Sequence, residues 1–369
     1  MRIDELQQIA QSSHFESNMG KQRINLSQKA YNILMMDMNA FYFADRSNLH
    51  LEQISSKIIN RVIQNFCLDA ESTISYDVQK EQERIRINLK ELDKDAQLLA
   101  VDLLCKAYEQ KLIDKASERL KVKGTSCSYS LNKTTIQNLA TVLSGDADHY
   151  GNRLDKYLKA LLEEYTELSY IERESVYFKK ELETIYNAIN SKKELKLSMV
   201  AGDLYIKPVI VQADIGKNYH YLAGFLSQND SSDEKSWSRK AIRINKIQKI
   251  QVWKSFRGIE SEKITNLKNL IAKRGIQYLS DGNVQKIFRV QFTKSGIKKY
   301  KSMQHMRPMY CKIEKEGDYT ILEFNCSEYQ LKTYLQRFGK EARVLSPDKL
   351  AKEMEKYFYQ AYLVYRNVF

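Results

Sequence analysis

The sequence has few of the residues and patterns that mark several large classes of protein. Only 3 prolines and 13 glycines occur among 369 residues, of which 43% are hydrophobic. This composition argues against a chain dominated by disorder or low-complexity repeats. No apolar run approaches the roughly 18 residues of a membrane span, and the N-terminus lacks the apolar core of a signal peptide. We therefore expect a globular, cytoplasmic protein of two or three domains.

Motifs for catalysis and metal binding are also missing. The five cysteines are scattered and form no C-x-x-C pair, so they predict reduced, mostly packed thiols rather than a zinc or redox site. There is no P-loop, no dinucleotide-type glycine-rich turn, no H-E-x-x-H and no nucleophile elbow. We expect a protein that is not an enzyme, with no catalytic residues, no metal and no cofactor.

What the sequence does have is an uneven distribution of charge. Lys and Arg total 59 against 46 for Asp and Glu, a net charge of +13. Residues 1–170 hold 22 basic and 24 acidic residues, 171–285 hold 20 and 13, and 286–369 hold 17 and 9. The excess of basic residues beyond position 170 suits a polyanion as partner, because each phosphate that is neutralised releases counterions. The alternative is that surplus lysine only keeps the protein soluble.

A strand-helix-helix pattern occurs twice in the first 170 residues. Residues 21–26 and 126–131 both alternate polar and apolar side chains, and each run is followed by a residue that can cap a helix, Ser27 and Asn132. Aligning the caps sets the two copies 105 residues apart. The pattern resembles ribbon-helix-helix DNA binders, in which two strands pair into a ribbon that enters the major groove. We predict that this one chain supplies both strands.

The outward side chains of that ribbon are the predicted groove-facing set: Lys21, Arg23, Asn25, Ser128 and Ser130. This half of the chain is slightly acidic, and its second strand offers only serines to a duplex. The alternative is therefore a packing or dimerisation unit. Between the copies, Asp93 or Asp95 starts a long helix with an apolar stripe that is typical of core: Leu98, Val101, Cys105, Tyr108 and Leu112.

The middle of the chain changes from helical to strand-like spacing. After one more helix come short alternating segments at 194–200, 203–213, 218–228 and 239–253. They predict a small, strongly bent antiparallel sheet or barrel. Arg239, Ala241, Arg243 and Asn245 would share one face of the last segment.

Three segments of this region resemble the WYL domain. They are Tyr-Ile-Lys-Pro at 205–208, Asn-Tyr-His-Tyr-Leu-Ala-Gly at 218–224 and Ala-Ile-Arg-Ile-Asn-Lys-Ile at 241–247. In that family a Trp-Tyr-Leu strand lies between a strand with a basic residue before a proline and a later Phe-Arg-Leu-Asp-Arg-Ile-like strand. The resemblance implies an SH3-like β-barrel that senses ligands, binding nucleic acid or nucleotide-like effectors in a basic groove.

Carried over by position, Tyr221 and Leu222 match the second and third motif residues, and His220 replaces the Trp. Arg243 and Lys246 match the two arginines. Cations beside aromatic rings also suit single-stranded nucleic acid, since phosphates meet the cations and bases stack on the rings. The predicted nucleic-acid or ligand site is Lys207, Tyr219, His220, Tyr221, Arg239, Arg243 and Lys246. The alternative is that these are solvated strand positions, with Tyr221 in the barrel core.

The last third predicts a strand, helix, hairpin, helix, strand and helix at 286–293, 294–303, 309–325, 327–338, 341–346 and 347–365. This βαββαβα order is ferredoxin-like. Residues 334–350 are similar to the extension that often follows WYL domains, which implies a homodimer. An aromatic tail would suit such an interface: Tyr357, Phe358, Tyr359, Tyr362, Tyr365 and Phe369.

Together these features predict an α+β multidomain protein. The ribbon-helix-helix-like region would span 1–170, the WYL domain 171–256 and the ferredoxin-like extension 257–369. This arrangement resembles the WYL-domain accessory proteins of type VI-D CRISPR systems. That resemblance implies single-stranded RNA binding and stimulation of an RNA-guided, RNA-cleaving nuclease. The alternative is a transcriptional regulator that reads duplex DNA through the ribbon.

Overall fold

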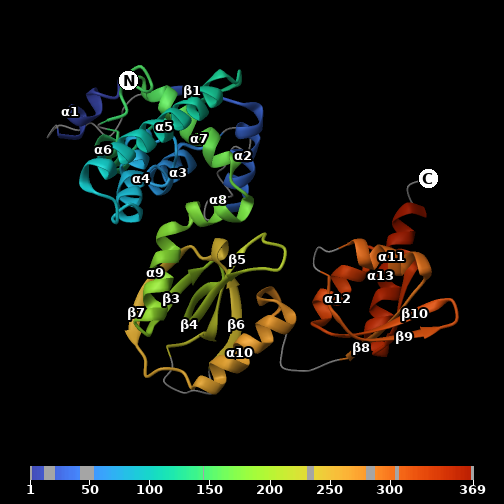
Figure 1. Ribbon diagram of the computed structural model, residues 1–369. Coiled ribbons are helices and arrows are strands. Elements are labelled where there is room, and N and C mark those ends of the chain that lie inside the picture. The colour runs from blue at the N-terminus through green and yellow to red at the C-terminus, as the bar shows by residue number, and fades with distance from the viewer. Residues whose placement is uncertain are drawn as a thin grey trace. The chain divides into compact units, whose positions relative to one another are not determined.

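A computed structural model describes residues 2–11, 21–41, 54–143, 145–230, 237–279, 287–303 and 307–366. Helices and antiparallel sheets both occur, so the fold is α+β (Figure 1). Contacts within the chain define two units, Met1–Glu183 and Thr184–Phe369. The division into three domains that end at 170, 256 and 369 stays a prediction. Within the described segments, no helix combines the length and apolarity that crossing a bilayer requires.

The first unit is mainly helical. Its two strands are β1 (Gln22–Leu26) and β2 (Thr125–Tyr129). Its helices are α1 (Glu5–Gln11), α2 (Gln28–Phe41), α3 (Ser56–Phe66), α4 (Ile74–Asn88), α5 (Lys94–Lys121), α6 (Lys133–Val142), α7 (Leu154–Glu167) and α8 (Tyr170–Tyr177). A further helix, α9 (Lys179–Asn190), follows directly.

The two predicted ribbon strands pair with each other. β1 and β2 are antiparallel, and Arg23 lies opposite Ser128. The 105-residue offset also makes Ser128 the equivalent of Arg23 in the second copy. Equivalent residues of two copies lie opposite each other only where a two-fold axis relates the copies. The two strands therefore pair within one chain, as predicted, and their register has the symmetry expected of two copies. Both predicted caps are present, since Ser27 Oγ and Asn132 Oδ1 accept from backbone amides three residues ahead at 3.0 and 2.9 Å.

The α4–α5 hairpin lies between the two copies in sequence. Asp93 caps α5 by accepting from the Ala96 amide at 3.0 Å, as predicted. Of the predicted core stripe, Val101, Cys105 and Leu112 are buried, but Leu98 is 72% exposed. The prediction for Leu98 was wrong, because three- and four-residue spacing identifies an apolar face but not how far the neighbouring helix covers it.

The second unit begins with a five-stranded antiparallel sheet. Its strands are β3 (Lys193–Met199), β4 (Gly202–Ala213), β5 (His220–Ser227), β6 (Ser238–Arg243) and β7 (Lys249–Ser255). They lie in the order β6-β5-β4-β3-β7. Among the described residues this sheet is open rather than closed into a barrel, because β6 and β7 form opposite edges. The predicted strand 239–253 is also broken, since Ile244–Lys246 is a 3-10 turn whose Ile244 and Asn245 are buried.

One face of this sheet packs against a helix. After β7 come α10 (Ser261–Arg274) and a 3-10 turn at Ile276–Tyr278. Tyr221 and Phe225 of β5 share a core cluster with Leu267 and Ile271 of α10. Since side chains alternate along a strand, Leu222 lies on the opposite face. The helix therefore covers the face on which Tyr221, Arg239 and Arg243 lie.

The chain ends in a second antiparallel sheet with helices. Its elements are β8 (Ile287–Phe292), α11 (Lys294–Ser302), β9 (Tyr310–Glu316), β10 (Tyr319–Asn325), α12 (Glu328–Leu335), β11 (Ala342–Ser346) and α13 (Asp348–Arg366). They follow the predicted βαββαβα order, and the strands lie as β11-β8-β10-β9. Tyr359, Tyr362 and Tyr365 of the aromatic tail are more than half exposed, whereas Phe369 lies outside the described residues.

Candidate nucleic-acid interface

Three of the predicted binding residues form one cluster on the first sheet of the second unit. Arg243 of β6 lies opposite Tyr221 of β5 in the strand register. Its Nε donates to the Tyr221 hydroxyl at 2.8 Å. Its guanidinium carbon lies 4.2 Å from the centre of the Tyr219 ring, within the range of a cation–π contact. We call Tyr219, Tyr221 and Arg243 the Arg243 cluster.

A tight turn holds Tyr219 beside the strand. The amide of Asp214 donates to the Tyr219 carbonyl at 3.0 Å, and the Asp214 carboxylate accepts from the Asn218 amide at 2.7 Å. Lys217 within the turn adopts a φ of 50°, which a non-glycine residue rarely does. These bonds hold the backbone of Tyr219 at the start of β5, where its ring stacks on the guanidinium.

The guanidinium of the Arg243 cluster is held by aromatic groups rather than by a direct ion pair, although the Asp214 carboxylate acts on it electrostatically. Among the described residues, Arg243 forms no ion pair with a carboxylate. Its side chain is held by a phenol and a ring, and neither removes its charge. Burial raises the pKa of the Tyr221 phenol, although the Arg243 hydrogen bond opposes the shift. Tyr221 therefore stays protonated at neutral pH, and Arg243 can still meet a phosphate.

Lys207 does not join this cluster. The strand register places Lys207 in a row with Phe225 and Arg239. Phe225 is four residues along β5 from Tyr221, so the two rows are about 13 Å apart. Its ammonium nitrogen lies 4.2 Å from the Trp237 ring centre and 4.0 Å from a carboxylate oxygen of Glu194. Glu194 is 3% exposed, so this lysine already compensates a buried acid.

The remaining predicted residues of this site are divided between different places. His220 alternates with Tyr219 and Tyr221 along the chain and so faces the other side of the sheet. Arg239 shares the face of Arg243 but lies in the Lys207 row. Lys246 ends the 3-10 turn and has left the strand. The prediction of one continuous basic track is thus replaced by a local cluster around Arg243.

One face of the ribbon is exposed, and the two strands contribute one cation to it. Arg23 and Asn25 of β1 and Ser126 and Ser128 of β2 are exposed, whereas their neighbours point into the core. Lys21 is exposed just before β1. Ser130 lies just beyond the end of β2 and is partly buried, and its backbone forms two hydrogen bonds with α3.

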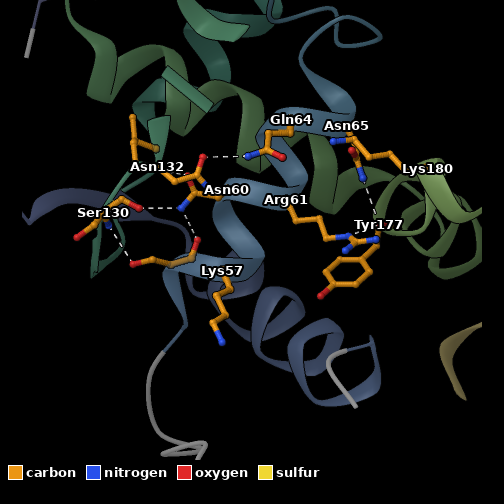
Figure 2. Close-up of a pocket in the computed structure, with 11 residues that line it drawn as sticks. Lys57, Asn60, Arg61, Gln64, Asn65, Ser130, Asn132, Tyr177 and Lys180 are labelled. Atoms are coloured by element: carbon orange, nitrogen blue, oxygen red, sulfur yellow. Dashed lines mark hydrogen bonds between the residues drawn. The ribbon is translucent and has the colours of Figure 1, made fainter. Parts of the chain in front are cut away.

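Beside that point lies a cavity of about 440 Å³ that the sequence analysis missed. It lies between α3, the end of the second ribbon strand and α8 (Figure 2). We call it the α3 cavity. Its lining residues are Ser56, Lys57, Asn60, Arg61, Gln64, Asn65, Ser130, Leu131, Asn132, Tyr177 and Lys180. The signal was a polar stripe at helical spacing along α3, opposite its apolar stripe.

Hydrogen bonds hold the walls of the α3 cavity in place. The Asn60 amide donates to the carbonyls of Ser56 and Ser130, both at 2.7 Å. Asn65 donates to the carbonyls of Val176 and Tyr177 at 2.8 and 3.1 Å. α3 therefore links the second ribbon strand to α8.

Across the described segments, no group of three His, Cys, Asp or Glu side chains could hold a metal ion. Four cysteines are buried and Cys311 is exposed, in agreement with mostly packed thiols. Burial raises the pKa of Cys127, in the ribbon, to about 11, so this thiol is protonated and unreactive at neutral pH.

The fold is similar to that of a solved CRISPR Cas-related protein. The two chains are 18% identical, the match covers 97% of each, and the TM-score is 0.74. Proteasome accessory factor B/C of Arthrobacter aurescens matches 99% of this chain and 54% of its own, at 10% identity and a TM-score of 0.28, which carries no argument. No family model and no curated protein matches the chain by sequence. The first match shows a shared fold over almost the whole chain.

Proposed function

We propose that this chain is a single-stranded RNA-binding accessory protein of a CRISPR system, acting with an RNA-guided, RNA-cleaving nuclease rather than as an enzyme. In this proposal the first unit is a ribbon-helix-helix-like pseudo-dimer. The second unit combines a WYL domain with a ferredoxin-like extension that mediates homodimerisation. The protein works in the cytoplasm without a metal or cofactor.

The Arg243 cluster is the observation that carries this proposal. A half-buried guanidinium stacked on a tyrosine ring, with no acid paired to it among the described residues, suits a phosphate next to a base. A duplex hides the faces of its bases, whereas a single strand can stack them on a ring. The site therefore favours an unpaired strand.

Two further findings support the proposal. The WYL-like segments contribute Tyr221 and Arg243 to the cluster, on adjoining strands. The shared fold with a CRISPR Cas-related protein extends over 97% of the chain, so it includes the ribbon as well as both sheets. An accessory role in RNA cleavage agrees with both findings and with the excess of basic residues beyond position 170.

A transcriptional regulator is the second candidate, because the paired ribbon provides a surface for the major groove. Its exposed strand residues include Arg23 and Asn25 on one strand and only serines on the other. A ribbon whose two strands carry one cation makes few contacts with phosphates, and affinity for a DNA duplex depends on such contacts. We therefore rank this function below RNA binding.

A titration of matched variants tests the two candidates. Changing Arg243 and Lys246 together to Ala should weaken binding of single-stranded RNA by about 10- to 100-fold, through the loss of a stacked cation and its phosphate contact. Changing Arg23 and Asn25 to Ala should alter it little. Lys240→Ala with Lys249→Ala removes the same charge from other strand positions and serves as the control. Circular dichroism verifies folding.

The opposite outcome would assign the protein to duplex DNA. In that case the Arg23 and Asn25 variant loses binding to a duplex, while the Arg243 and Lys246 variant keeps full affinity for RNA. Equal losses in the Lys240 and Lys249 control would mean that binding depends on net charge alone, and the proposed site would then be abandoned.

A further inference from the structure

The first half of α5 exposes three leucines. Leu98, Leu99 and Leu103 are 72%, 63% and 59% exposed. Exposed leucines are ordinarily scattered singly over a surface, whereas these three lie within two turns of one helix. Together they present on the order of 300 Å² of apolar surface, which is the size of the largest patch on a typical monomer, and such patches are often functional.

Two of these leucines lie on the side of α5 that faces away from α4. Val101 and Cys105 belong to the core cluster between α4 and α5. With 3.6 residues in each turn, Leu99 and Leu103 point about 160° away from those two residues. α5 is therefore apolar on two sides. A helix that is apolar on more than one side is typical of a larger packed assembly.

Carboxylates are set among the leucines. Asp95 and Asp102 are seven residues apart, which is two turns, so they lie one above the other on α5. Around the helix, both lie between Leu98 and Leu99. Asp102 accepts from Lys106 at 2.7 Å, and this pair is exposed. We call the three leucines and the two aspartates the α5 patch.

The charge around the α5 patch is opposite to that of the whole chain. Residues 91–109 hold five acidic and two basic residues, although the chain carries a net charge of +13. A locally acidic surface repels the phosphates of RNA, and it also repels the same surface of a second copy. The α5 patch therefore suits a partner that is both apolar and basic.

A cavity between α4 and α5 borders the patch. Its volume is about 440 Å³, and Leu98 and Asp102 line it together with Val101 and Cys105. The latter two side chains are buried, so they give the cavity an apolar wall. A partner helix that lies along α5 could insert an aliphatic side chain here, as amphipathic helices do when they bind in apolar grooves.

We propose that the α5 patch docks an amphipathic helix of a partner protein. The helix places an aliphatic stripe on the leucines and lysine or arginine beside Asp95 and Asp102. This inference goes beyond RNA binding and stands without it, because the patch lies in the first unit and the Arg243 cluster in the second. For the proposed accessory role, it provides a surface for a protein partner.

Selection from a displayed library of three-heptad helices tests this chemistry on the full chain. The library carries Leu, Ile, Val or Ala at the two apolar positions of each heptad, and Lys or Glu at the flanking positions. Selected helices should be enriched in Lys. Leu99→Gln with Leu103→Gln should weaken their binding about 10- to 100-fold. Asp95→Asn with Asp102→Asn should weaken it about 3- to 10-fold at low salt.

Two control variants carry equivalent changes elsewhere. Ile87→Gln with Val122→Gln replaces two other exposed aliphatic side chains. Asp114→Asn with Glu118→Gln removes two exposed acids from the second half of α5. Both controls should bind the selected helices like the original protein. The leucine variant should keep its affinity for single-stranded RNA, so this experiment and the RNA titration can fail independently.

Three results would overturn the proposal. The first is a library that yields no helix whose binding depends on Leu99 and Leu103. The second is enrichment of Glu in the selected helices, which would give the partner the opposite charge. The third is a higher oligomer in light scattering that the leucine variant loses, which would make a second copy the occupant. Lys-rich helices that bind both controls but neither patch variant at full affinity support the proposal.

Discussion

Replacing Asn60 with Ala should free the end of the second ribbon strand from α3. The Asn60 side chain is buried and makes three hydrogen bonds with the backbone. Its Nδ2 donates to the carbonyls of Ser56 and Ser130, and its Oδ1 accepts from the Asn132 amide at 2.8 Å. An alanine leaves the Ser130 carbonyl and the Asn132 amide without this partner, directly after β2.

The size of the effect follows from the number of bonds. Ser56 can keep its helical backbone bond, so the main loss is the two bonds to residues 130 and 132. Each lost bond to a buried backbone group costs about 1–1.5 kcal/mol, so local opening becomes easier by about 2–3 kcal/mol. Hydrogen exchange through that opening should accelerate about 30- to 150-fold.

Hydrogen-exchange mass spectrometry of peptides covering 125–132 measures this opening. The control is Gln110→Ala, because Gln110 is exposed on α5 and its side chain donates a bond to Asp114 of the same helix. That variant should leave exchange in 125–132 unchanged. The reasoning is refuted if Asn60→Ala exchanges at the original rate, or if both variants accelerate exchange equally.

Two other predictions concern the stability of the first unit. Asp37 is fully buried and pairs with Arg173 at 2.7 Å. Asp37→Ala should therefore lower the free energy of unfolding in urea by about 3–5 kcal/mol. The double variant Asp37→Leu with Arg173→Met should lower that free energy by less, because it leaves no buried charge without a partner. Equal losses in the single and double variants would contradict the role of the pair. Leu99 and Leu103 of α5 are 63% and 59% exposed, so changing both to Gln should alter stability by under about 0.5 kcal/mol. In calorimetry, Leu112→Ala should lower the free energy of unfolding by about 2–5 kcal/mol. A similar loss of stability in the Leu99 and Leu103 variant would show that this face of α5 is covered.

The ribbon could be predicted because its determinants are local. Alternation identified both strands, Ser27 and Asn132 marked the helix starts, and the common offset implied the symmetric pairing that places Arg23 opposite Ser128. The order of elements in the C-terminal third followed from the same local signals. Apart from the offset between the two copies, each of these features depends on residues within a few positions of one another.

The features that were missed depend on contacts between distant segments. The break at Ile244–Lys246 arises because Ile244 and Asn245 are buried there, which alternation along the chain cannot show. The covering of Tyr221 by α10 joins residues some 50 positions apart. Likewise, the polar face of α3 becomes a cavity wall only when residues 130–132 and 176–180 fold against it.

Net charge alone does not locate the proposed RNA site, and the salt dependence of the proposed titration should reflect this. In the first sheet of the second unit, Lys196 pairs with Asp203 at 2.8 Å, Lys254 with Asp230, and Lys207 lies beside Glu194. A lysine already paired with a carboxylate is less available to neutralise a phosphate and to release the counterions of the nucleic acid. Each phosphate bound on a single strand contributes a slope of about 0.7 in the logarithm of affinity against the logarithm of salt concentration. Contact with one to three phosphates around Arg243 gives a slope of about 0.7–2, whereas engagement of all seven excess cations of 171–285 would give about 5. A slope near the larger value would mean that RNA displaces these carboxylates, and the Arg243 cluster would then be one contact among many.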